Sequence, residues 1–211
     1  MKLMKVTSVV MLLAMLSLAG SANAELLLNR SFDDLDGGTG NPTSASWGTW
    51  NWDPSGGSAG AAVLLDGAPD PANSGPAYAE IWAWAGGSGG FYQGGLAPVV
   101  GEVYELSIWA RDQGWGDDKN LSVTLHVDDG SGMSLLVNEM LYSGAGLGDS
   151  DYHKFSVLTP AIPAGTIAAE FGFTFAGSGT FALDDASMAV PEPMTLGLLG
   201  LGGLFLRRRR A

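Results

Sequence analysis

Three tryptophans and an arginine in the middle of the chain have side chains that suit a sugar. From Tyr104 to Arg111 every second residue is apolar, so a strand here would place Trp109 and Arg111 together on its other face. An indole stacks on the apolar face of a sugar ring, and a guanidinium donates hydrogen bonds to its hydroxyls. Trp82 and Trp84 are two positions apart and would share a face of another strand. We therefore expect Trp109, Arg111, Trp82 and Trp84 to bind a glycan; the alternative is that they anchor a core or a loop.

The sequence patterns that would indicate catalysis are weaker than those that indicate sugar binding. The stretches Gly86 to Gly90 and Gly56 to Gly60 both match Gly-x-Ser-x-Gly, but that nucleophile elbow joins a strand to a helix, and neither stretch precedes a helical pattern. The two histidines, His126 and His153, lack the spacing of a zinc-binding pair. The carboxylates are too numerous to single out a glycosidase pair. The sequence therefore predicts a non-catalytic protein, with a secreted hydrolase as the least favoured alternative.

The charge of the chain excludes one class of partner. Residues 25–190 contain four basic and twenty-one acidic residues, a formal net charge of −17. A surface of this sign repels phosphate backbones, so we expect no nucleic acid partner. The chain also has no cysteine, which excludes disulfides, thiolate metal sites and a cysteine nucleophile.

The segments that must position these residues have the pattern of β-strands. Alternating apolar residues and clusters of Gly, Asp, Asn, Ser and Pro predict an all-β domain of two packed antiparallel sheets. Residues 40–76 are predicted to form long loops around one short strand. The strands with the clearest pattern are Glu25–Asn29, Ala61–Leu65, Tyr78–Trp84, Gly90–Gln93, Tyr104–Arg111, Leu121–Val127, Ile167–Phe175 and Phe181–Leu183.

Four short motifs in order resemble the galactose-binding-like jelly rolls, which include many carbohydrate-binding modules. They are Leu27–Asp33, Gly90–Gln93, Tyr104–Arg111 and Gly179–Asp185, and the resemblance covers most of residues 25–188. It implies a two-sheet antiparallel jelly-roll sandwich that binds glycan across a sheet.

The same resemblance implies a structural calcium ion, the one cofactor we expect. The positions that match the family's calcium-binding acids are Asp33 with Asp184 or Asp185. Carboxylates and loop carbonyls are the hard oxygen ligands that calcium requires. Strand alternation favours Asp185, because it would lie on the same face as Phe181 and Leu183. The alternative is a solvated acidic turn.

The amino terminus has the pattern of a secretory signal peptide. Lys2 and Lys5 precede the apolar stretch Val6–Ala19, and Ala22 and Ala24 form the small-x-small pattern that signal peptidases cleave. We expect residues 1–24 to be removed and the protein to be exported.

The carboxyl terminus, residues 189–211, combines three features. A Pro191-Glu192-Pro193 motif precedes the apolar run Met194–Leu206, and four arginines follow: Arg207, Arg208, Arg209 and Arg210. A helix of that length spans about 20 Å, less than the roughly 30 Å hydrocarbon core of a bilayer. The arginines would lie on the cytoplasmic side.

This arrangement resembles the PEP-CTERM sorting signal of Gram-negative bacteria. The resemblance implies a hydrophobic helix that associates transiently with the inner membrane, cleavage by an exosortase near Pro-Glu-Pro, and release to the cell surface or extracellular matrix. A plain membrane anchor at the tail is the alternative. Together, the sequence predicts an exported protein that associates with extracellular polysaccharide, or a structural or adhesion protein of the matrix without glycan binding.

Overall fold

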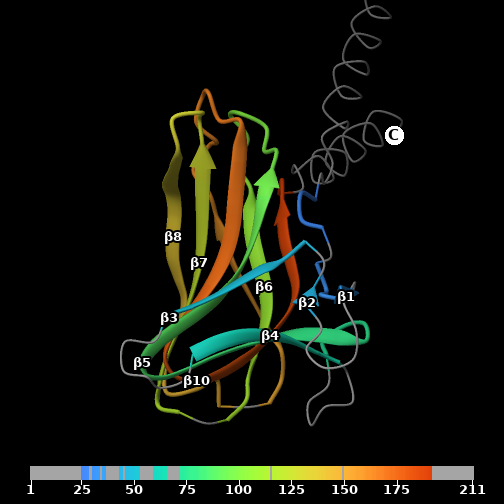
Figure 1. Cartoon of the computed structure of the whole chain (residues 1–211), viewed down its shortest axis with the longest axis vertical. Helices are drawn as coiled ribbons and strands as arrows, with labels where there is room; N and C mark the ends of the chain where they lie inside the picture. The colour runs from blue at the N-terminus through green and yellow to red at the C-terminus, as the bar shows by residue number, and fades with distance from the viewer. Residues whose placement is uncertain are drawn as a thin grey trace, which may run out of the picture. The chain divides into compact units, whose positions relative to one another are not determined.

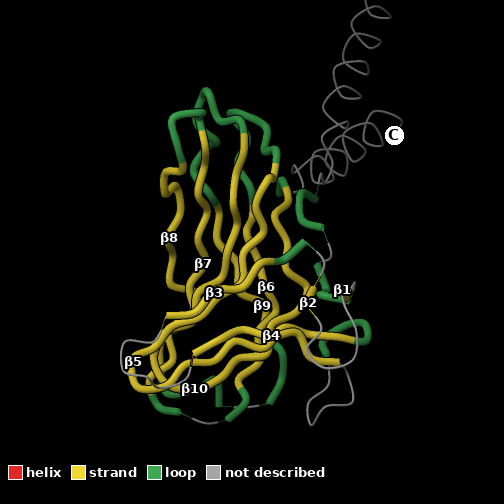
Figure 2. The backbone as a smooth tube through the Cα atoms, viewed as in Figure 1, coloured by secondary structure: helices red, strands yellow, loops and turns green. Residues whose placement is uncertain are grey.

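The computed structural model describes residues 25–28, 30–33, 35–36, 43–44, 46–52, 59–65, 72–114, 116–148 and 150–191. The signal segment 1–24 and the sorting segment beyond Pro191 lie outside these residues, and so do the terminal helices predicted for them. Residues 25–189 form one compact unit. Figure 2 shows that the described chain consists of strands and loops.

The described chain forms an all-β antiparallel jelly roll. Its strands are β1 (Leu35–Asp36), β2 (Thr43–Ser44), β3 (Gly48–Trp52), β4 (Ala59–Leu65), β5 (Ala77–Leu96), β6 (Glu105–Asp112), β7 (Asp118–Asp128), β8 (Met133–Gly144), β9 (His153–Leu158) and β10 (Ala168–Ala189). All the strand pairs are antiparallel, and β1 pairs only with β2.

Two long strands, β5 and β10, divide the strands into two sheets (Figure 1). Residues 168–178 of β10 pair with β7 on one side and with the second half of β5 on the other. This gives a first sheet in the order β8-β7-β10-β5-β3. Residues 179–189 of β10 pair instead with β6 and the first half of β5, giving a second sheet in the order β9-β6-β10-β5-β4.

Glycines permit the bend of β10 between the two sheets. The register with β5 shifts between Gly177 and Gly179, and both residues have positive φ angles, of 117° and 140°. A Cβ atom on Gly177 would collide with the carbonyl oxygen of Asp118. The bend therefore requires glycine for its backbone conformation and for its close approach to β7.

The core lies between the sheets and matches the predicted alternation. Its first-sheet side chains come from β7 and β10, and its second-sheet side chains from β5, β6 and β10. The fully buried ones include Leu121, Val123, Leu125, Phe171, Phe173, Phe175, Ile81, Leu106, Ile108, Phe181 and Leu183. Trp47, from the stretch predicted as loop, is also buried and packs 5.0 Å from Phe32, centroid to centroid.

Several sequence predictions need correction. Tyr78–Trp84 and Gly90–Gln93 were predicted as separate strands and are parts of β5. Ile167 was predicted to face the core but is 65% exposed, because it precedes β10. Of Glu25–Asn29, the described residues contribute one bridge, between Glu25 and Ala189. The stretch 40–76 contains β2 and β3 as well as the predicted strand, which is β4. Among the described residues, no helix is long and apolar enough to cross a bilayer.

Candidate functional site

The four predicted glycan-binding residues lie on the outer face of the second sheet. Trp82 on β5 pairs with Thr180, and Trp84 follows two residues later on the same strand. On β6, Arg111 pairs with Ala182 and Trp109 with Asp184. Their neighbours along these strands, including Ile81 and Ala110, face the core. Strand alternation grouped Trp109 with Arg111 and Trp82 with Trp84, and the fold places the two pairs on either side of β10.

These four side chains are less exposed than those of an open binding face. Arg111 is only 4% exposed, and its guanidinium carbon lies 5.1 Å from the centre of the Tyr152 ring. The three tryptophans are half-buried. Thr180 and Ala182, which lie between β5 and β6, are 2% and 0% exposed. The arginine and the middle of this face are therefore covered, and the tryptophans are its partly exposed groups.

A hollow of about 220 Å³ brings Trp82 together with Trp50, which the sequence did not select. Thr49, Trp50 and Asn51 from β3 form one side, and Gly60 from β4 lies on the other. The Asn51 side chain donates a hydrogen bond to the Ala59 carbonyl (3.1 Å), which holds the two edge strands together. We call this the indole hollow. It offers two aromatic rings, a hydroxyl and an amide in one small space.

The rings beside the hollow lie against glycine backbones. Trp50 pairs with Gly90, Trp82 with Gly60 and Tyr92 with Gly48 across neighbouring strands. A side chain on any of these glycines would collide with the ring of its partner. A ring that lies on a glycine presents its other face outward. Trp50 and Tyr92 are each 37% exposed, and Trp52 is 58% exposed.

A signal for Trp50 was present in the sequence. Trp50 and Trp52 are two positions apart, as in a strand. The surrounding Gly and Ser residues, which indicate loops, obscured it. Glycine is needed at the positions that pair with Trp50, Trp82 and Tyr92, because the aromatic rings lie across them.

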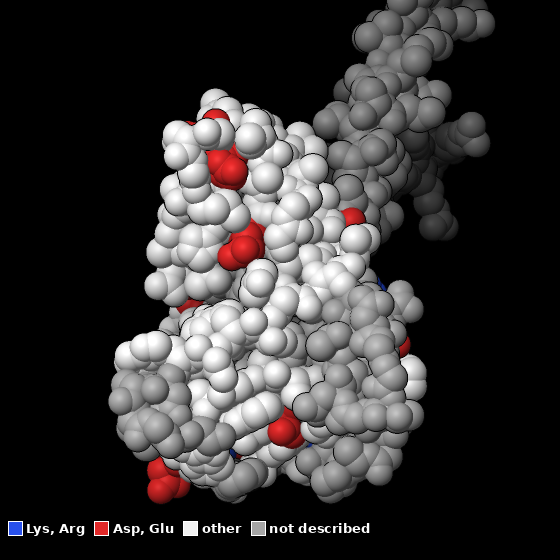
Figure 3. All heavy atoms as spheres, in the orientation of Figure 1, with Lys and Arg blue, Asp and Glu red and all other residues white. Residues whose placement is uncertain are grey.

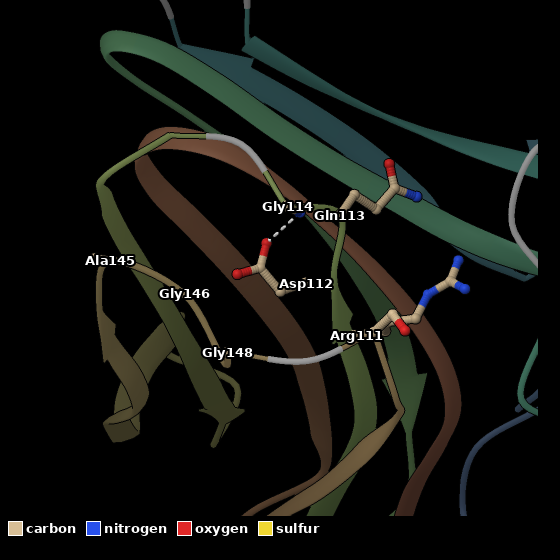
Figure 4. Close-up of a pocket in the computed structure, with 8 residues that line it drawn as sticks. Arg111, Asp112, Gln113, Gly114, Ala145, Gly146 and Gly148 are labelled. Atoms are coloured by element: carbon tan, nitrogen blue, oxygen red, sulfur yellow. Dashed lines mark hydrogen bonds between the residues drawn. The ribbon is translucent and has the colours of Figure 1, made fainter.

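A second cavity, of about 450 Å³, lies at the end of β6 (Figure 4). Its walls come from Arg111–Gly114 and from the loop after β8, which contributes Ala145, Gly146, Gly148 and Ser150. We call it the loop-end cavity. Asp112 points toward the glycine-rich loop, whereas the side chains of Arg111 and Gln113 point to the other side of the strand. Arg111 is the only predicted glycan-binding residue among its lining residues.

Asp112 is fixed in place by several donors. It forms a buried ion pair with Lys119, whose side chain is 0% exposed. Its Oδ1 also accepts a hydrogen bond from the Gly114 N–H (2.8 Å), and its Oδ2 accepts one from the Leu147 N–H (3.1 Å). This carboxylate holds together β6, β7 and both loops of the cavity.

The three acids predicted to bind calcium meet at the loop of residues 73–77. Asp33 Oδ1 accepts a hydrogen bond from the Ala77 N–H (3.1 Å). Asp184 Oδ2 accepts one from the Ser74 N–H (2.8 Å), and Asp185 accepts bonds from Ser31, Asn73 and Ser74 side chains. Within the described ranges, no group of three or more His, Asp or Glu side chains is arranged to hold a metal ion. Calcium remains a prediction.

Asp184, rather than the favoured Asp185, is the fully buried acid of the pair. Asp185 has a φ of 49°, and the register between β10 and β6 shifts after Asp184, which breaks the alternation used for the prediction. Burial raises the pKa of Asp184 from 3.8 to about 7, although hydrogen bonds from the backbone of Ser74 and Asp185 oppose the shift.

The structure also places the Gly-x-Ser-x-Gly serine and the two histidines considered in the sequence analysis. Ser88, in the first Gly-x-Ser-x-Gly match, lies inside strand β5 and not at a strand-to-helix turn. His126 lies on β7 with its Nδ1 4.0 Å from Glu170 Oε1, and His153, predicted in a loop, begins β9. The face that Figure 3 shows is mostly uncharged among the described residues, with isolated carboxylates and almost no Lys or Arg.

No protein-family model and no curated protein matches this chain. Solved structures do match this chain. The enzymatically active domain of bacteriophage CBA120 tailspike protein 4 is 14% identical, with a TM-score of 0.54 over 78% of this chain and 21% of that one. A cyclase from Fischerella sp. TAU is 16% identical, with a TM-score of 0.57 over 80% and 97% of the two chains. A xylan-binding domain from CBM 22 is 20% identical, with a TM-score of 0.50 over 79% and 96%.

This chain thus spans about a fifth of the tailspike domain but nearly all of the cyclase and the xylan-binding domain. Its structural neighbours include carbohydrate-binding modules and enzymes alike. At these identities the likeness establishes the fold, an antiparallel jelly-roll sandwich.

Proposed function

We propose that this is an exported, non-catalytic protein that associates with neutral polysaccharide through the indole hollow. The observation that carries the proposal is that Trp50 and Trp82 line one hollow together with Thr49 and Asn51. Sugar rings pack their C–H faces on indoles, and their hydroxyls exchange hydrogen bonds with hydroxyl and amide groups. The fold it shares with a xylan-binding domain supports the same class of ligand.

Retention on polysaccharide tests this role. Residues 25–189, which contain the whole core, should be retarded in native gels that contain xylan or another neutral polysaccharide from a panel. Trp50→Ala and Trp82→Ala should each weaken retention at least tenfold, since stacked aromatic groups dominate such contacts. Ile167→Ala, at an exposed position just before β10, should leave retention unchanged.

Trp109→Ala distinguishes the sequence-based site from the indole hollow, because Trp109 lines neither cavity. We expect this variant to bind as the wild type does. Unchanged mobility of the wild type on every polysaccharide would favour the alternative, a structural or adhesion protein of the matrix.

We also propose that the two terminal segments direct the protein out of a Gram-negative cell. The patterns around Ala22 and Ala24 and around Pro191-Glu192-Pro193 support cleavage at both ends. Mass spectrometry of the released protein should give a chain that begins at Glu25 and ends near Pro193. A released or membrane-bound form that ends in Ala211 would support the plain anchor.

A further inference from the structure

We infer that Glu25 fixes the point at which the sorting protease can cut the carboxyl-terminal segment, because its carboxylate holds the end of β10 in the fold. Glu25 is the first residue after the predicted signal cleavage site. The inference rests on the export and sorting proposed above, but the hold on β10 is also tested without a sorting protease.

The Glu25 side chain connects the two ends of the domain. Its Oε1 accepts a hydrogen bond from the Met188 N–H (2.9 Å), and its Oε2 accepts one from the Ser187 hydroxyl (2.6 Å). The Leu27 N–H also donates to Oε1 (3.1 Å), and Arg30 Nη1 lies 3.5 Å from Oε2. The Glu25 side chain is only 22% exposed, so water competes weakly for these bonds. Hydrogen bonds to an ionised acceptor are roughly twice as strong as those between neutral groups. We call this set of contacts the Glu25 clamp.

The first residues of the domain take the place of β5 beside the last residues of β10. The pairing of β10 with β5 ends at Leu183, whereas its pairing with β6 continues to Ala189. On the side that β5 leaves, Glu25 forms a bridge with Ala189. The Leu26 N–H donates to the Met188 carbonyl on the same side (3.1 Å). The end of β10 therefore has backbone partners on both sides, and those on one side belong to the residues that begin at Glu25.

The chain leaves the sheet directly after β10. Pro191 has no N–H to donate, so the hydrogen-bond ladder cannot continue through it. Residues 190–193 are the whole connection between Ala189 and the apolar run that begins at Met194. These four residues span at most about 14 Å when extended. The backbone outside the sheet and before the apolar run is therefore short.

A protease can cut only where it finds free backbone. Proteins bind extended peptides through main-chain hydrogen bonds, so residues already paired in a sheet are not available until they open. Cleavage within β10 then depends on the fraction of molecules in which the end of the strand has opened locally. The Glu25 clamp lowers this fraction and so confines the cut to residues 190–193. Without the clamp, residues 184–189 become a second place for cleavage.

Digestion with subtilisin, a protease of broad specificity, tests the clamp on residues 25–193. Mass spectrometry should show that the wild type is trimmed to a product that ends between residues 189 and 193 and then persists. Glu25→Ala should lose the end of β10 about tenfold faster or more, because it removes an ionised acceptor. Ser187→Ala removes one donor and should have a smaller effect. Glu139→Ala, which removes an exposed carboxylate on β8, should be trimmed as the wild type is.

Hydrogen exchange separates local opening from loss of the whole fold. In Glu25→Ala the amides of Leu26 and Met188 should exchange faster than in the wild type. The amide of Val123, in β7, should stay as protected as in the wild type. If Val123 loses protection as well, Ser187→Ala becomes the deciding variant in the digestion. Equal rates of trimming for the wild type and the deciding variant would show that the clamp does not protect β10.

The full precursor, expressed in a Gram-negative strain that contains an exosortase, tests the consequence for sorting. The released wild-type chain should begin at Glu25 and end within residues 190–193. The released Glu25→Ala chain should begin at the same position, and part of it should end within residues 184–189. If this variant ends only where the wild type ends, the inference is wrong while export and sorting stand. A wild-type chain that ends in Ala211 overturns the proposed sorting and the inference together.

Discussion

Asp184 has a carboxyl group that the fold removes from water, and its pKa rises from 3.8 to about 7. At a pH between these two pKa values, the folded protein keeps a proton on Asp184 that the unfolded chain releases. The free energy of unfolding should therefore fall as pH rises from about 4 to about 7, and then level off. From this group alone, the domain should be roughly 2 to 3 kcal/mol more stable at pH 5 than at pH 8, measured by urea unfolding.

The comparison with Asp184→Asn isolates this effect. The asparagine side chain does not titrate. The difference in the free energy of unfolding between this variant and the wild type should therefore change by roughly 2 to 3 kcal/mol between pH 5 and pH 8. Asp129→Asn is the control, because hydrogen bonds from Ser131 lower the pKa of that fully exposed carboxyl. If wild type and Asp184→Asn differ in the free energy of unfolding by the same amount at pH 5 and at pH 8, the folded protein does not hold a proton on Asp184.

At the scale of elements, the Lys119–Asp112 pair joins the end of β6 to the start of β7 and is buried on both sides. Lys119→Met would leave Asp112 charged and buried without its cation. The expected loss of stability is about 3 to 5 kcal/mol in urea unfolding. Lys154→Met is the matched control, because Lys154 pairs with Glu105 at 3.2 Å on the exposed surface and should contribute under about 1 kcal/mol. Equal losses for the two variants would refute the structural role of the buried pair.

The three acids predicted to bind calcium lie at the junction of β10 with the loop before β5. Calcium requires ionised carboxylates, so it would compete with the donors now bonded to Asp185 and with the proton on Asp184. Calcium should raise the melting temperature of the wild type, more at pH 8 than at pH 5. Asp185→Ala should abolish the rise, and Asp129→Ala, in the turn between β7 and β8, should keep it. A wild type that calcium does not stabilise at either pH would exclude the site.

Elements with strong alternation could be predicted from sequence, and weaker ones could not. The strands with buried Leu121–Val127 and Phe171–Phe175 were found because every second side chain faces the core. β8 and β9 were missed because each lies at the edge of a sheet, where exposed and half-buried residues blur the alternation. The union of two predicted strands in β5 depends on long-range pairing with β10 that no local pattern reveals.

At the scale of the molecule, strand alternation paired Trp109 with Arg111 on one strand and Trp82 with Trp84 on another, but it could not show which of these side chains a ligand reaches. That depends on burial by segments distant in sequence, such as Tyr152 against Arg111. The two cavities were not predictable for the same reason. One joins β3 to β4 and β5, and the other joins the end of β6 to the loop after β8.

The net charge of −17 over residues 25–190 leads to a prediction for the whole molecule. A neutral glycan releases no counterions from the protein when it binds, so salt should hardly affect its affinity. We expect the dissociation constant for the preferred oligosaccharide to change by less than about twofold between 20 and 500 mM NaCl, and duplex DNA to show no binding at either salt concentration. A steep loss of affinity with salt would mean that the ligand is charged.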